Sequence, residues 1–208
     1  MRTGSLLHQV LFDFFETGVY DKNREFVLTT SPSMDILISS NLERLLYLIA
    51  GEDSDKTKGL MDELKSTGKY TITEDMKVRL ADFAAGFASE KATDDSIKTV
   101  YDRTGYVMDT HTAVADHVCN EYKKATGDMK KCVVASTASP YKFVKSVMTA
   151  IDAENANEDE FTLLPKLKET SGVEMPQAIK DILEANVLHT IECDYDKMQK
   201  TVEEILGL

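Results

Sequence analysis

The sequence predicts a helix-rich α/β domain with a small, mostly parallel sheet. Segments with apolar residues at helical spacing dominate the chain, which indicates that most of it is α-helix. Two short apolar runs rich in β-branched residues, residues 132–135 (CVVA) and 187–191 (VLHTI), are typical of buried strands. The first run leads into a polar turn and then a helix, the order of elements found in α/β sheets.

The helices are placed by apolar spacing together with the residues that begin and end them. Residues 40–43 (SNLE) form a capping-box pattern, in which serine and glutamate satisfy the first backbone amides. Gly18, Gly51 and Gly68 follow apolar-periodic segments and suit the residue just after a helix. The expected helices cover residues 10–15, 42–49, 54–67, 73–84, 93–103, 109–125, 140–151, 158–170, 176–183 and 194–206, and residues 70–72 form a brief extended piece.

Composition narrows the class of protein and of partner. The chain has 208 residues, of which 42% are hydrophobic, enough for one domain of ordinary size. Its net charge of −12 disfavours nucleic acid and anionic membranes as partners, because both attract basic surfaces. No apolar run approaches the length of a membrane helix, and we expect no signal peptide. The three cysteines are odd in number and widely spaced, which favours a reducing cytoplasm over a disulfide framework.

The polar turn after residues 132–135 is the first candidate site. Ser136 and Thr137 follow the expected strand and precede a helix that begins at Pro140, a residue suited to the first helical turn. Ligands of open α/β sheets bind beyond the carboxyl ends of strands, and a helix N-terminus favours anions. The alternative is an ordinary loop in which these hydroxyls cap the helix.

Residues 105–113 (GYVMDTHTA) form a second candidate site, a polar cluster at a helix N-terminus. Asp109 and Thr110 are both suitable caps, and Thr112 lies in the first turn beside them. His111 also lies in the first turn, where the helix dipole disfavours its protonated form. The alternative here is a capped helix with a surface histidine.

The sequence contains no motif for several other kinds of active site. It has neither the GxSxG of a serine hydrolase nor the GxxxxGK of a phosphate loop. His111, His117 and Cys119 do not share one helix face at ligand spacing, so no metal site is expected.

Four segments show a resemblance to a known family. They are residues 10–23 (VLFDFFETGVYDKN), 29–47 (TTSPSMDILISSNLERLLY), 105–115 (GYVMDTHTAVA) and 134–143 (VASTASPYKF). From residue 10 onward the chain resembles the C-terminal part of threonine synthase, and the order and approximate spacing of the segments match that family. Residues 10–208 are therefore expected to form one domain, and residues 1–9 are interpreted as a remnant outside it.

The resemblance implies a three-layer fold-type II enzyme of the tryptophan-synthase-β-like group that uses pyridoxal 5′-phosphate (PLP). The implied reaction, that of a carbon–oxygen lyase, converts O-phosphohomoserine and water into threonine and phosphate. In that group a neutral hydroxyl at a strand end meets the pyridine nitrogen, a position that matches Thr137, with Ser136 beside it. Asp109, Thr110, His111 and Thr112 would form part of the site wall, and no metal is implied.

The departures from the family predict an incomplete site. The family's Schiff-base lysine and the loop that cradles the cofactor phosphate belong to an N-terminal half that this sequence lacks. Ser139 also stands where many relatives have histidine. We therefore expect a catalytic-region fragment that is inactive and binds no PLP by itself, with self-association through the face left by the missing half. The alternatives are a free-standing small-molecule or partner-binding module derived from the same fold, and a purely structural domain.

Overall fold

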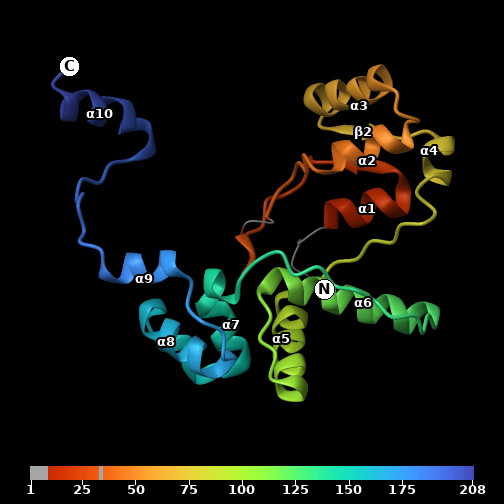
Figure 1. The fold of residues 1–208 in the computed structure, drawn as a ribbon. Helices are drawn as coiled ribbons and strands as arrows, with labels where there is room; N and C mark the ends of the chain where they lie inside the picture. The colour runs from red at the N-terminus through yellow and green to blue at the C-terminus, as the bar shows by residue number, and fades with distance from the viewer. Residues whose placement is uncertain (1–8, 33–34) are drawn as a thin grey trace. The chain divides into compact units, whose positions relative to one another are not determined.

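The structure, a computed structural model, describes residues 9–32 and 35–208. The described residues separate after Glu174 into two units, which are treated in turn. The first contains α1 (Gln9–Thr17), β1 (Val19–Asp21), α2 (Leu42–Ile49), α3 (Ser54–Thr67), β2 (Lys69–Thr71), α4 (Glu74–Val78), α5 (Glu90–Thr104), α6 (Thr110–Thr126), α7 (Val144–Ile151), α8 (Glu160–Ser171) and two short 3-10 helices, Pro140–Phe143 and Ala153–Asn157 (Figure 1). The second contains α9 (Gln177–Glu184), α10 (Met198–Leu206) and the 3-10 helix Tyr195–Lys197.

The helices α1, α2, α3 and α4 and the two strands share one apolar core. At its centre the rings of Tyr20 and Tyr70 stack 5.3 Å apart, and Phe14 packs edge-on against both at 6.0 Å. This core is made of Val10, Phe14, Tyr20, Leu42, Leu46, Ile49, Ala50, Leu64, Tyr70, Ile72, Met76 and Leu80.

The sheet of the described residues differs from the predicted one. It has two strands, β1 and β2, which pair antiparallel with Tyr20 opposite Tyr70. The strand β1 lies outside the segments that the sequence predicts to be extended. The tyrosines explain the pairing, because stacking across the ladder buries both rings in the core.

Several helices lie where the sequence predicts them. The helix α3 spans the predicted residues and is followed by Gly68 at φ +82°, a conformation that favours glycine.

The expected capping box before α2 is wrong, because Asn41 caps that helix without a side-chain bond. The amides of Leu42 and Glu43 instead donate to the carbonyls of Ser39 and Ser40 in a preceding turn. Backbone carbonyls of the preceding turn therefore accept from these amides in place of the serine side chain.

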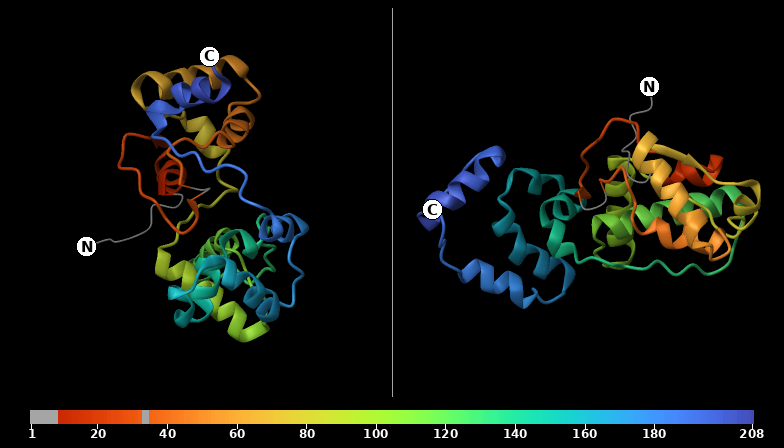
Figure 2. Two further views of the ribbon diagram at one scale, coloured as in Figure 1. Left: turned by 90° about the vertical axis from the view of Figure 1, so that its left-hand side faces the viewer. Right: turned by 90° about the horizontal axis from the view of Figure 1, so that it is seen from above.

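The helices α5 to α8 carry the second half of this unit. The helix α5 packs against α6 and α7, and α7 also packs against α8 (Figures 1 and 2). Pro140 starts a 3-10 turn that runs directly into α7, as the sequence predicts, and Ser139 caps it by accepting from the Tyr141 amide at 3.3 Å. The N-terminus of α6 lies near the turn that precedes α7, since His111 packs against Phe143.

The predicted strand at residues 132–135 is not formed. These residues have no regular structure, and Val133 is 96% exposed. A strand needs neighbours for its backbone N–H and C=O groups, and the described residues place none beside it. The apolar run thus lacks the sheet that its composition predicts.

In the second unit, α9 and α10 present apolar side chains that nothing in that unit covers. The predicted strand at residues 187–191 is again irregular and exposed. Met198, Val202 and Ile205 lie at helical spacing in α10, but each is more than half exposed. Two short helices and a linker cannot form a core that buries them. In neither unit does any described helix have the length and apolar character needed to cross a membrane.

Candidate functional site

The buried carboxylate of Asp109 organises the N-terminus of α6. As the N-cap residue, Asp109 accepts hydrogen bonds through Oδ1 from the amides of His111 at 2.9 Å and Thr112 at 3.2 Å. Its other oxygen accepts a short hydrogen bond from the Thr112 hydroxyl. The Asp109 side chain is 0% exposed, so these donors replace the water it would otherwise bind.

Ser136 joins this cluster from a distant part of the chain. Its Oγ lies 3.0 Å from Thr112 Oγ1 and 3.5 Å from Asp109 Oδ2. Thr112 has one hydroxyl proton, which it donates to Asp109. Ser136 is therefore the donor in its hydrogen bond with Thr112. The structure thus brings together Asp109, Thr112 and Ser136, three residues that the sequence singles out in two separate motifs. We call this the 109–112–136 network.

Thr137 lies next to this network and, like Ser136, is exposed. Unlike Ser136, it forms no hydrogen bond with any other described residue. It does not follow a strand, since residues 132–135 form none. Its hydroxyl is therefore available to a ligand, whereas that of Ser136 is committed to the network.

Thr110 and His111 have polar atoms that are buried and unsatisfied. Neither the hydroxyl of Thr110 nor Nε2 of His111 has a partner among the described residues. The imidazole packs edge-on against Phe143, with ring centres 4.8 Å apart, so the alternative of a surface histidine is wrong. Burial lowers the pKa of His111 and nearby Lys142 adds to this, while Asp109 and Asp35 oppose it. At neutral pH the ring is uncharged and can exchange a hydrogen bond with a ligand.

Residues 29–32 and Asp35 add to the polar surroundings of His111, whose pKa the Asp35 carboxylate acts to raise. Asp35 accepts hydrogen bonds from the amide and hydroxyl of Thr29, both at 2.7 Å. The amide of Thr30 donates to the carboxylate of Glu90, at the start of α5. Ser31 is fully buried and its hydroxyl has no partner among the described residues. Besides the family resemblance of residues 29–47, the sequence signal here is a run of hydroxyl residues shortly before an aspartate, which is also typical of an ordinary turn.

Two open grooves of the first unit are lined by other residues. One, of about 680 Å³, lies between α2 and α3. The other, of about 740 Å³, is lined by α1, residues 82–87 and one side of α6, including Cys119. Neither groove includes a residue of the 109–112–136 network.

Comparison with known proteins supplies the family. Residues 112–202 match the family model described as threonine synthase, C-terminal. Threonine synthase-like 1 of Macaca fascicularis is 38% identical over 153 residues, covering 73% of this chain and 20% of that protein. Threonine synthase of Saccharomyces cerevisiae is 32% identical over 176 residues, covering 76% of this chain and 34% of that protein.

Solved structures agree with the sequence comparisons. The crystal structure of PLP-bound threonine synthase from Brucella melitensis superposes with a TM-score of 0.67 and 31% identity, covering 95% of this chain and 37% of that one. The yeast threonine synthase structure gives a TM-score of 0.73 at 28% identity, covering 96% of this chain and 40% of that one. The chain spans between a fifth and about a third of the length of the curated relatives it matches. Its resemblance to threonine synthases, and specifically to their C-terminal part, is confirmed in sequence and in fold.

Proposed function

We propose that this chain forms the C-terminal portion of a PLP-dependent threonine synthase, the enzyme that converts O-phosphohomoserine and water into threonine and phosphate. The family match supports the reaction class. The observation that carries the proposal for the site is the 109–112–136 network, which fastens residue 136 to the N-terminus of α6. Thr137, with its free hydroxyl, is thereby held at the edge of a polar, partly unsatisfied region.

The residues present fit one side of the cofactor. Bound PLP supplies an electron sink for bond making and breaking at the amino-acid substrate. The hydroxyl of Thr137 is neutral and can donate to an unprotonated pyridine nitrogen, whereas a carboxylate there would favour the protonated ring. The unsatisfied atoms of Ser31, Thr110 and His111 also fit a polar ligand, because buried polar groups without partners are costly.

Asp109 and Thr112 would act through Ser136 rather than on the ligand. Their part is to orient the segment that carries Thr137, so they are positioning residues. The chain supplies neither the lysine nor the phosphate-binding loop that the family uses. We propose that these come from the N-terminal half of the family's catalytic region, and that this chain alone has no turnover.

The test is to complete the site with a relative. Residues 10–208 are fused to the N-terminal portion of yeast threonine synthase, and phosphate release and threonine formation from O-phosphohomoserine are measured with added PLP. We expect turnover by the fusion and none by the 208-residue chain. A fusion that folds and shows the absorbance of bound PLP, yet forms no threonine, would refute the proposal.

A further inference from the structure

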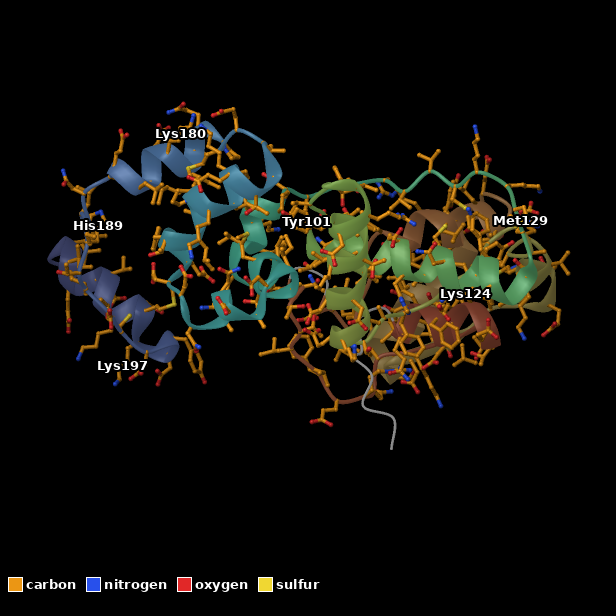
Figure 3. The ribbon with its side chains drawn as sticks, turned by 90° about the horizontal axis from the view of Figure 1, so that it is seen from below. Tyr101, Lys124, Met129, Lys180, His189 and Lys197 are labelled. Atoms are coloured by element: carbon orange, nitrogen blue, oxygen red, sulfur yellow. The ribbon has the colours of Figure 1, made fainter. Side chains whose placement is uncertain are left out.

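Two cysteines lie on segments of the first unit that run side by side. After α6 ends, the chain reverses and residues 127–136 return along that helix (Figures 1 and 3). In Figure 3, Lys124 marks the last turn of α6 and Met129 marks the reversal. The return is fastened at both ends, by the Gly127 amide to the Lys123 carbonyl at 2.9 Å and by Ser136 to Thr112 at 3.0 Å.

The lengths of the two segments put the cysteines opposite each other. From Thr112 to Thr126 the helix rises about 21 Å, at 1.5 Å per residue, and Cys119 is the middle residue. The nine steps from Gly127 to Ser136 can span at most about 30 Å, so the return path is nearly direct, and Cys132 lies near its middle.

The side chains agree with this placement. The thiol of Cys132 interacts with that of Cys119, and this interaction is the main reason why the pKa of Cys119 is raised, with burial second. Both cysteines are reduced in the structure. Cys119 is half-buried on α6, whereas Cys132 is exposed.

We propose that Cys119 and Cys132 form a reversible disulfide that fastens residues 127–136 to α6. The sequence alone disfavoured disulfides because the cysteines are widely spaced. The reversal after α6 removes that objection for this pair, and it leaves Cys193, in the second unit, as a lone thiol.

The oxidant is a low-molecular-weight disulfide such as oxidised glutathione. Cys132 is the exposed thiol, so its thiolate attacks one sulfur of the oxidant, forming a mixed disulfide and releasing one glutathione thiol. The sulfur of Cys119 then attacks that of Cys132 and releases the second glutathione. Two protein thiols lose two electrons to the oxidant, and their protons end on the two glutathione thiols.

The bond would act on the candidate site through Ser136. Cys132 is four residues before Ser136, so a link to α6 shortens the free segment that carries Ser136 and Thr137. This consequence rests on the proposed function, whereas formation of the bond does not.

The 208-residue chain is equilibrated with mixtures of reduced and oxidised glutathione, blocked with N-ethylmaleimide and digested with trypsin. Lys123, Lys124, Lys130 and Lys131 lie between the two cysteines, so digestion separates them unless a disulfide joins them. At about 1 mM glutathione we expect linked peptide to exceed the Cys132–glutathione adduct by about tenfold, because two neighbouring thiols of one chain have a higher effective concentration than free glutathione. Cys193 is the internal control and should carry only glutathione.

One variant and one further measurement make the outcome decisive. In Cys119→Ser, Cys132 should accumulate as the glutathione adduct. Oxidation should also slow trypsin cleavage of the native chain after Lys130 and Lys131 by about tenfold, and should leave cleavage of Cys119→Ser unchanged. The proposal is overturned if linked peptide is absent where Cys193 is already modified, if Cys193 pairs with either cysteine equally well, or if cleavage is not slowed.

Discussion

Replacing Asp109 by alanine tests the network that organises the candidate site. The substitution removes the N-cap of α6, whose amide donors come from His111 and Thr112. It also leaves the buried Thr112 hydroxyl without its carboxylate acceptor and deprives Ser136 of one of its two partners. Asp109→Asn keeps a capping oxygen and places an amide group where Thr112 can accept from it.

The magnitude follows from these contacts. Loss of a helix N-cap costs about 0.5–2 kcal/mol, and leaving a buried polar group unsatisfied costs about 1–3 kcal/mol. Since the two effects share Thr112 they are not strictly additive, and we expect Asp109→Ala to lower the free energy of unfolding by about 2–4 kcal/mol. Asp53 caps α3 with a single amide bond at 2.9 Å and is exposed, so Asp53→Ala should cost only the capping part, about 0.5–2 kcal/mol.

The assay is urea unfolding of the chain, followed by far-ultraviolet circular dichroism, for Asp109→Ala, Asp109→Asn and Asp53→Ala. Asn is also a good N-cap, so Asp109→Asn should lose about 1 kcal/mol or less. If Asp109→Ala proves no more destabilising than Asp53→Ala, the buried network contributes nothing to stability beyond capping, contrary to this prediction.

Three further predictions follow from the structure. Because burial lowers the pKa of His111 below its ordinary 6.5, the unfolded chain binds more protons. Stability should fall as pH drops below about 6.5, and His111→Gln should remove this part of the loss in pH-dependent unfolding, while His189→Gln, at an exposed site, should not. Tyr20→Phe should cost about 1–3 kcal/mol in urea unfolding, since its hydroxyl bonds two backbone groups, whereas Tyr70→Phe should be nearly neutral because its hydroxyl bonds no described residue. PLP added to the 208-residue chain and reduced with borohydride should label no single lysine stoichiometrically by mass spectrometry, and one fully labelled lysine would contradict this.

Local signals in the sequence predict the helices well, and signals that need a distant partner do not predict the strands. The helix α3 begins after Asp53 and ends at Gly68, both residues whose effect operates within one turn. Residues 132–135 and 187–191 have the composition of strands. Among the described residues, however, no strand lies beside either segment to pair with its backbone. The sequence does not predict the pairing of Tyr20 with Tyr70, because no residue near either tyrosine indicates which segment will pair with it.

The candidate site was predictable where one turn of helix determines it. Asp109 is followed closely by the amides it accepts from, so the sequence predicts its role as a cap. The contact of Thr112 with Ser136 joins residues far apart in the chain and follows only from the fold. The burial of His111 against Phe143 likewise depends on how α6 packs near the start of α7.

The measurement that tests the account most directly is PLP affinity at residue 137. In the fusion of residues 10–208 with the N-terminal portion of yeast threonine synthase, the dissociation constant of PLP is compared for Thr137, Thr137→Ala and Thr137→Ser. Loss of one hydrogen bond, about 0.5–1.5 kcal/mol, predicts that Thr137→Ala weakens binding about 2- to 13-fold and that Thr137→Ser restores it. Equal affinity in all three would contradict the assignment of this hydroxyl to the cofactor.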